Sequence, residues 1–121
     1  MTDEDMPSDA DLRRRFAARL RDELATLERD SRETAQSREP VALDQQSVGR
    51  LSRIDAMQTQ AMAQANDRRR ETRKLQIATA LRRFELGTFG LCAGCQEFIG
   101  MKRLGFDPAT VQCMACARAR E

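Results

Sequence analysis

The residues best suited to chemistry are four cysteines near the carboxyl-terminal end of the chain. They form two C-x-x-C pairs separated by seventeen residues: Cys92, Cys95, Cys113 and Cys116. Each C-x-x-C turn can point two sulfurs at one ion, and the separation lets the two turns close a tetrahedron. Four thiolates fill that tetrahedron, so no position remains for a catalytic water. The spacing therefore predicts one structural Zn²⁺ held by these four cysteines.

The residues around the cysteines favour metal binding. Gly94 lies inside the first pair, where a tight turn would bring backbone amides toward sulfur. The second pair precedes a short predicted C-terminal helix that runs to Arg120, and the positive end of that helix would stabilise thiolates. Four thiolates around Zn²⁺ leave a local charge of about −2. The basic residues available to offset that charge are Lys102, Arg103, Arg118 and Arg120.

The rest of the sequence indicates the cellular compartment in which these cysteines act. The chain begins with an acidic segment that has no apolar run behind it, which argues against a signal peptide. No stretch is apolar enough for a membrane span. We therefore expect a cytoplasmic protein, whose reduced thiols serve as metal ligands rather than disulfides. A redox switch that releases the ion and an iron–sulfur cluster are the alternatives to a purely structural zinc site.

Two long helices are expected ahead of the cysteines. Ser8 can cap a helix that continues to about Ser37, with one apolar stripe: Leu12, Phe16, Leu20, Leu24 and Leu27. Pro40 interrupts this pattern, because proline disfavours helical geometry in the residue before it. Asp44 can cap a second helix, which is expected to end at Gly87. Its apolar residues are predicted to continue through Leu75, Ala78 and Leu81.

Two helices with single apolar stripes and a short connection are expected to pack antiparallel. Counting from the turn places Leu20 near Ala61 and Phe16 near Ala65. The predicted fold is mainly α: a disordered N-terminus (1–8), an antiparallel coiled-coil hairpin (9–86, turn near 38–44) and a four-cysteine zinc-finger module (87–121) with a short C-terminal helix. The stripes could also serve self-association, so the oligomeric state stays open.

The C-terminal segment resembles the zinc finger of the DksA/TraR family of bacterial transcription regulators. The cysteine spacing and several flanking residues occur in the same order as in that family. The residues that carry the similarity are Gly87-Thr88-Phe89-Gly90-Leu91-Cys92, Cys95, Ile99-Gly100, Arg103-Leu104, Pro108, Cys113 and Cys116. Members of that family bind RNA polymerase and reach into its secondary channel with the tip of the coiled coil. The resemblance therefore implies RNA polymerase as the partner. It also implies a tip formed by the predicted turn, where Glu39 and Asp44 are the candidate contacts.

The residues also bear on functions other than polymerase binding. An enzyme is not expected, because the cysteines are committed to metal and no catalytic constellation can be assembled from the rest. The net charge of +2 divides into −3 for residues 1–39 and +5 for residues 40–121, and this polarity is too weak to indicate direct DNA binding. The second predicted helix carries a cluster of basic residues: Arg68, Arg69, Arg70, Arg73 and Lys74. These residues could contact phosphates, but a solvent-exposed helix face commonly has the same composition. A nucleic-acid-binding zinc module and a coiled-coil adaptor are the alternative functions.

Overall fold

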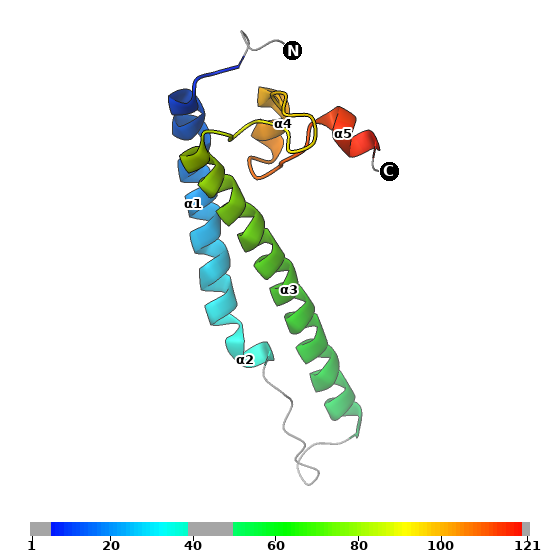
Figure 1. Ribbon diagram of the computed structural model, residues 1–121. Helices are drawn as coiled ribbons and strands as arrows, with labels where there is room; N and C mark the ends of the chain where they lie inside the picture. Colours follow the sequence, from blue (N-terminus) through cyan, green and yellow to red (C-terminus); the bar gives the residue numbers. More distant parts are fainter. Residues whose placement is uncertain (1–5, 39–49, 120–121) are drawn as a thin grey trace. The chain divides into compact units, whose positions relative to one another are not determined.

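The structure, a computed structural model, describes residues 6–38 and 50–119. Helices occupy most of these residues (Figure 1): α1 (Asp9–Glu33), α2 (Ala35–Arg38), α3 (Arg50–Leu86), α4 (Met101–Phe106) and α5 (Met114–Ala119). An isolated antiparallel bridge joins Leu91 and Phe98. The predicted fold class, mainly α with a long helix pair ahead of the cysteines, is confirmed. Within the two described ranges, no helix has the length and apolarity needed to cross a membrane.

The start of α1 follows the predicted capping pattern. The Ser8 hydroxyl accepts a hydrogen bond from the backbone N–H of Asp11 at 3.1 Å, and the Ser8 carbonyl accepts one from Leu12 at 3.0 Å. The first bond satisfies one of the amides that the start of a helix leaves free, and the second is the first regular backbone bond of the helix. The helix ends at Glu33, earlier than the predicted Ser37, and a turn at Thr34 separates it from α2.

The chain folds as two compact units. The first contains residues 6–24 and 74–119, which are the beginning of α1, the end of α3 and the cysteine-bearing segment. The second contains residues 25–38 and 50–73, which are the rest of α1, α2 and the earlier part of α3. The cysteines therefore share a unit with one end of each long helix.

Aromatic packing joins the helix ends of the first unit to the cysteine-bearing segment. The rings of Phe84 and Phe89 stack with their centroids 3.9 Å apart, and Phe16 of α1 lies 5.9 Å from Phe89. Leu12 and Leu104 are fully buried in the same unit. Because α1, α3 and the segment after Gly87 all contribute to this core, the helix ends form a base for the cysteine turns.

The register of α1 against α3 differs from the predicted one. In the first unit Arg13 donates a hydrogen bond to the carbonyl of Phe84 at 3.2 Å. Counting inward along antiparallel helices from this bond brings Leu20 level with Ile77, and both side chains are fully buried. The predicted neighbour, Ala61, is exposed. The predicted register was wrong because matching large residues with small ones fits several registers equally well. In the structure, the bulky apolar residues of both helices are instead buried together in one core.

The buried face of α3 also differs from the expected one. Leu75 is 70% exposed and Ala78 is exposed, although both were expected to pack. The buried residues are Ile77, Ala80 and Phe84, which share one helix face at steps of three and four. Since α3 carries apolar residues on more than one side, its sequence pattern alone does not choose between these faces.

A polar network takes the place of an apolar core in part of the second unit. The Ser31 hydroxyl, on a residue only 8% exposed, donates a hydrogen bond to Oδ1 of Asp67 at 2.9 Å. Arg70 donates to Ser31 Oγ at 3.3 Å and to Asp67 at 3.3 Å, while Arg38 forms an ion pair with the same carboxylate at 3.4 Å. One carboxylate of α3 therefore ties α1 and α2 to α3.

The turn at Thr34 is part of the same network. Its hydroxyl accepts hydrogen bonds from Arg38 and Arg70, both at 3.0 Å, and donates one to the carbonyl of Asp30 at 2.8 Å. Gln64 donates to the carbonyl of Arg38 at 3.2 Å. These bonds hold α2 against α3 and explain why the chain bends after Glu33.

At its other end, α3 stops where the sequence predicted. Gly87 adopts φ 74°, a left-handed conformation that glycine reaches without penalty. The N–H groups of Thr88 and Phe89 then donate to the carbonyl of Arg83 at 2.9 and 3.2 Å, which closes the helix end. The chain leaves α3 here and enters the cysteine-bearing segment.

Candidate metal centre

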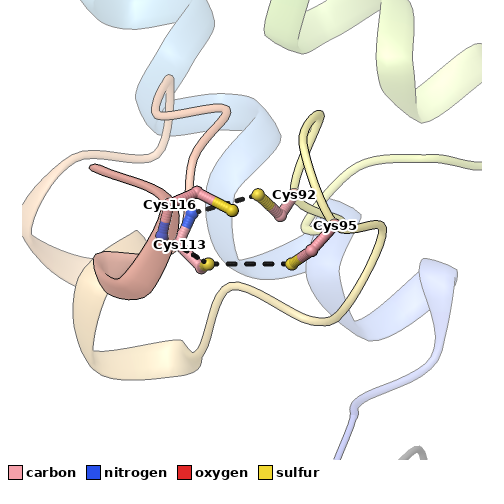
Figure 2. A group of neighbouring side chains, drawn as sticks. All are labelled: Cys92, Cys95, Cys113 and Cys116. Atoms are coloured by element: carbon pink, nitrogen blue, oxygen red, sulfur yellow. Dashed lines mark hydrogen bonds between the residues drawn. The ribbon is translucent and has the colours of Figure 1, made fainter. Parts of the chain in front are cut away.

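The four cysteine side chains converge in the first unit. Figure 2 shows the thiols pointing toward one another, and all four sulfurs lie within 4.8 Å of one another. The sulfurs of Cys95 and Cys113 are 3.7 Å apart. This distance is close to the ~3.8 Å edge of a tetrahedron whose zinc–sulfur bonds are ~2.3 Å long. The donor set and its geometry therefore fit a tetrahedral zinc ion.

The first C-x-x-C pair is held by a tight loop around the Leu91–Phe98 bridge. The N–H of Cys92 donates to the carbonyl of Glu97 at 2.8 Å, and the N–H of Gln96 donates to the carbonyl of Cys92 at 2.8 Å. The amide of Gly94 donates to the Cys92 sulfur at 3.3 Å, as expected from a glycine in the C-x-x-C turn. The loop thus brings a backbone amide to the sulfur.

The second pair lies at the start of α5. The N–H of Cys113 donates to the Cys92 sulfur at 3.3 Å, and the N–H of Cys116 donates to the Cys113 sulfur at 3.4 Å. A backbone hydrogen bond from Ala93 to the carbonyl of Val111, 2.8 Å long, joins the two loops directly. Amides at the beginning of the helix therefore favour thiolates, as the sequence predicted.

Cys92 is the most buried of the four, and its surroundings favour the ionised thiol. Its side chain is 1% exposed. The pKa of its thiol is lowered to about 6, first by the hydrogen bond from the Cys113 amide, then by the Cys95 and Gly94 amides, which together outweigh burial. The thiolate is the form that binds a metal ion. Backbone amides therefore contribute most to preparing Cys92 for coordination.

The neighbouring sulfurs act in the opposite direction on Cys116. The pKa of its thiol is raised to about 12, first by its hydrogen bond with the Cys92 sulfur and then by Cys113 and Cys95. A second thiolate close to the first is unfavourable because like charges repel. A divalent cation among the sulfurs removes that penalty, so the cluster as a whole favours a bound cation.

Arg83 contributes a positive charge that the sequence analysis did not assign to this site. It lies in the last turn of α3, and its guanidinium donates a hydrogen bond to the backbone carbonyl of Leu91. Burial lowers the pKa of Arg83, while the charge of Cys92 acts in the opposite sense, which places the two groups within electrostatic reach. No spacing signal could have identified Arg83, because it precedes the finger and reaches it only through the end of α3.

The basic residues predicted to offset the charge of the thiolates differ in their contacts. Arg103 donates to the carbonyl of Gln112 at 2.7 Å, immediately before Cys113, and therefore holds the second cysteine loop in place. Lys102 and Arg118 are exposed. Arg120 lies outside the described residues, as do the candidate tip residues Glu39 and Asp44.

Comparison with known proteins supports the metal assignment. Residues 87–121 match the prokaryotic dksA/traR C4-type zinc finger family. The donor set and this match together identify one structural zinc ion as the cofactor. A comparison with curated proteins found no match.

The fold of the chain is similar to that of a solved structure. The structure of transcription factor DksA2 from Pseudomonas aeruginosa matches with a TM-score of 0.68 and 18% sequence identity. The match covers 93% of this chain and 81% of the DksA2 chain. It therefore extends well beyond the finger and includes the long helices. The predicted resemblance to the DksA/TraR family is confirmed for residues 87–121, which match its C4-type zinc finger, and the fold of the chain is similar to that of DksA2.

Proposed function

We propose that this chain is a transcription regulator of the DksA/TraR type that acts by binding RNA polymerase. The observation that carries the proposal is the presence, in one chain, of the family's C4 zinc finger and a DksA2-like fold. DksA2 is named as a transcription factor. The fold alone does not specify a function, so the finger match is the stronger support.

In this proposal the zinc ion has a structural role, and Cys92, Cys95, Cys113 and Cys116 are its ligands. Zinc bound by four thiolates has a filled coordination sphere, so it crosslinks the chain rather than activating water. The ion would fasten the Cys92 loop to the beginning of α5. The amides of Gly94 and Cys113 orient the Cys92 sulfur for this role.

We further propose that the helix pair forms a hairpin domain (9–86), followed by the finger module (87–121), and that the hairpin tip enters the secondary channel of the polymerase. Glu39 and Asp44 are the proposed tip contacts. The network around Asp67 supports this part of the proposal, because it anchors α2, whose last residue is Arg38. A helix that is already anchored loses less entropy when a partner binds beside it.

Crosslinking from the tip to the polymerase tests the proposed function. A photoreactive residue at position 39 or 44 is expected to crosslink to purified RNA polymerase, at a position inside the secondary channel. Asp44→Asn keeps a capping oxygen but removes the charge, whereas Asp44→Ala removes both. Both variants should lose activity in promoter-complex assays if the charge contacts the polymerase. Crosslinks confined to the polymerase exterior would exclude the tip contacts, and full activity of both variants would exclude Asp44.

A DNA-binding experiment separates this proposal from the alternative of a nucleic-acid-binding module. Binding to duplex DNA through the arginines at positions 68–70 would weaken steeply with added salt. We expect no such binding by the purified protein in a gel-shift assay. A salt-sensitive shift that disappears in an Arg68→Ala, Arg69→Ala double variant would instead favour the nucleic-acid function.

A further inference from the structure

The second unit, residues 25–38 and 50–73, is not held by an apolar core like that of the first. Among the residues whose burial the structure describes, every buried apolar side chain lies in the first unit. Within that same set, the buried residue of the second unit is the polar Ser31. Contacts other than buried apolar packing must therefore fix α1 and α2 against this part of α3.

The large apolar residues that α3 carries in this unit are only loosely packed. Ile54, Met57 and Met62 are 42, 53 and 67% exposed. A groove of about 330 Å³, lined by residues that include Thr34, Met62 and Arg70, leaves space between α3 and the turn after α1. An apolar contact has no direction, so loosely packed apolar side chains fit several registers of two antiparallel helices. Apolar contacts therefore do not select the register of this unit.

The polar network around Asp67 does have directional contacts, and they come from three helices. The Asp67 carboxylate accepts hydrogen bonds from Ser31 of α1 and Arg70 of α3, and it pairs with Arg38 of α2. Arg38 also donates to the carbonyl of Ser31 at 2.7 Å. The three charged side chains are at most 24% exposed. Because they are largely shielded from water, losing a partner costs each of them more than it would at the surface.

A change of register would break this network. Sliding α1 and α2 along α3 by one helical turn, ~5.4 Å, would place Leu27 or Ala35 where Ser31 lies. Neither side chain can donate a hydrogen bond to Asp67. The carboxylate would then remain shielded from water with part of its bonding lost, which makes the slipped register unfavourable. A buried polar group that fixes the register of paired helices is the best-attested use of such groups.

We propose that Asp67 is a positioning residue for polymerase binding: it fixes the register of α1 and α2 against α3 in the second unit. That register sets the point from which the chain continues beyond Arg38 toward the proposed tip contacts. Molecules in another register present those contacts at the wrong place and bind poorly. The inference rests on the proposed function, because the partner is the same polymerase. It assigns to the network a contribution to accurate placement that is separate from its contribution to stability.

Replacing the whole network with apolar residues separates register from stability. The triple variant combines Asp67→Leu, Arg38→Met and Arg70→Leu. We expect its unfolding temperature to equal or exceed that of the unmodified protein, because exchanging a buried ionic network for apolar side chains is often neutral or stabilising. Its register should become heterogeneous, since the directional contacts that select one register are gone.

Spin labels on non-canonical amino acids report the register without disturbing the cysteines. Positions 29 and 55 are exposed sites on α1 and α3 of the second unit, at different heights along the two helices. A slip of one turn therefore changes their separation by up to ~5.4 Å. Dipolar electron resonance should give one narrow distance for the unmodified protein and a broad or double distribution for the triple variant.

Affinity for purified RNA polymerase completes the test. If only about one molecule in ten of the triple variant holds the native register, its apparent affinity falls about tenfold. We expect a loss of at least this size although the variant is no less stable. The matched control is Glu28→Gln, which neutralises an exposed carboxylate of α1 in the same unit and should bind normally. Zinc content and far-UV circular dichroism check that each variant is folded.

A single, unchanged distance in the triple variant would overturn the proposal. Normal polymerase binding by a variant whose distance has changed would overturn it as well. Should the triple variant not fold, Asp67→Ala takes its place under the same two criteria. If the unmodified protein binds polymerase and every variant binds equally well, the positioning role fails while the proposed function stands. If the unmodified protein does not bind polymerase, both proposals fail.

Discussion

Arg83, in the last turn of α3, donates a hydrogen bond to the backbone carbonyl of Leu91, the residue before Cys92. A residue of the long helix thereby positions the first cysteine loop and brings a positive charge toward its buried sulfur. The finger and the helix end are joined by this contact as well as by apolar packing.

Replacing Arg83 should weaken zinc retention. Arg83→Met preserves side-chain length but leaves the Leu91 carbonyl without its donor and removes a charge near Cys92. We expect a loss of about 1 kcal/mol in finger stability, the usual cost of one lost hydrogen bond. Zinc should also pass more readily to a competing chelator, followed with a colorimetric indicator. Arg82→Met is the control, because Arg82 is the exposed neighbour on the same helix. Equal zinc retention in both variants would exclude the role of Arg83.

Removing the metal should unfold the finger but leave helix elsewhere. Structural zinc contributes ~10 to 16 kcal/mol in small domains, more than a finger of this size gains from its apolar residues. Excess chelator should therefore expose the backbone amides of residues 87–119 to hydrogen exchange. Amides within residues 25–38 and 50–73 should keep more of their protection. If the finger amides remain protected after the zinc has been removed, the structural role of the ion is wrong.

Two glycines of the finger should respond in opposite ways to alanine. A Cβ at Gly94 would lie 3.2 Å from the Cys116 sulfur, too close for a ligand that cannot move without shifting the metal. Gly94→Ala should therefore lower zinc affinity. A Cβ at Gly105 would meet nothing within 4 Å, and Gly105 is helical, so Gly105→Ala should stabilise the finger by about 0.5–1 kcal/mol. Zinc competition and thermal unfolding of the two variants, compared directly, check this contrast.

Gln96 should tolerate glycine better than any branched residue. Its φ of 65° lies in the left-handed region, which costs most residues ~1–2 kcal/mol. Gln96→Gly removes this cost but gives the unfolded chain more freedom, so the net gain should be about 1 kcal/mol or less. Gln96→Val should destabilise the finger. Thermal unfolding of the zinc-loaded variants measures both effects, and a more stable valine variant would contradict the backbone assignment.

Acid should weaken the second unit through Asp67. Burial alone would raise the pKa of this carboxyl, but the hydrogen bond from Ser31, the charge of Arg38 and the contacts of Arg70 lower it below the ordinary value of 3.8. A lowered pKa means that the carboxylate stabilises the fold above pH 3.8 and that this contribution is lost as the pH falls through the lower, folded value.

Asp67→Asn should therefore be less stable than the unmodified protein at pH 7, and the difference should narrow below about pH 4. Thermal unfolding across this pH range measures the effect. Asp55→Asn, at an exposed position of the same helix, is the control. A difference that stays constant with pH would indicate that Asp67 contributes through packing and not through charge.

Local patterns were sufficient to predict the two long helices, one boundary of each and the metal site. The Ser8 cap and the stop at Gly87 were predicted correctly, because each depends on the chemistry of a few adjacent residues. The convergence of the cysteines was likewise predictable, since a C-x-x-C turn constrains two sulfurs within four residues. The resemblance to the DksA/TraR finger used the same local information.

The packing of the helices was not predictable in this way. The register of α1 against α3, the burial of Ile77 instead of Leu75, and the Asp67 network all depend on residues distant in the sequence. An apolar stripe indicates that a helix packs against another element, but it does not indicate which residues of that element it contacts.

The sequence by itself determined the two long helices, the beginning of the first at Ser8, the end of the second at Gly87 and the four thiols that fit zinc, because these follow from backbone preferences and short-range spacing. Only the tertiary structure decided that Phe84, Phe89 and Phe16 share a core, that Arg83 supports the first cysteine loop and that Phe106 is left exposed. The physical reason is that burial and long-range hydrogen bonding depend on how the whole unit fills its interior, and many packings satisfy the same local pattern.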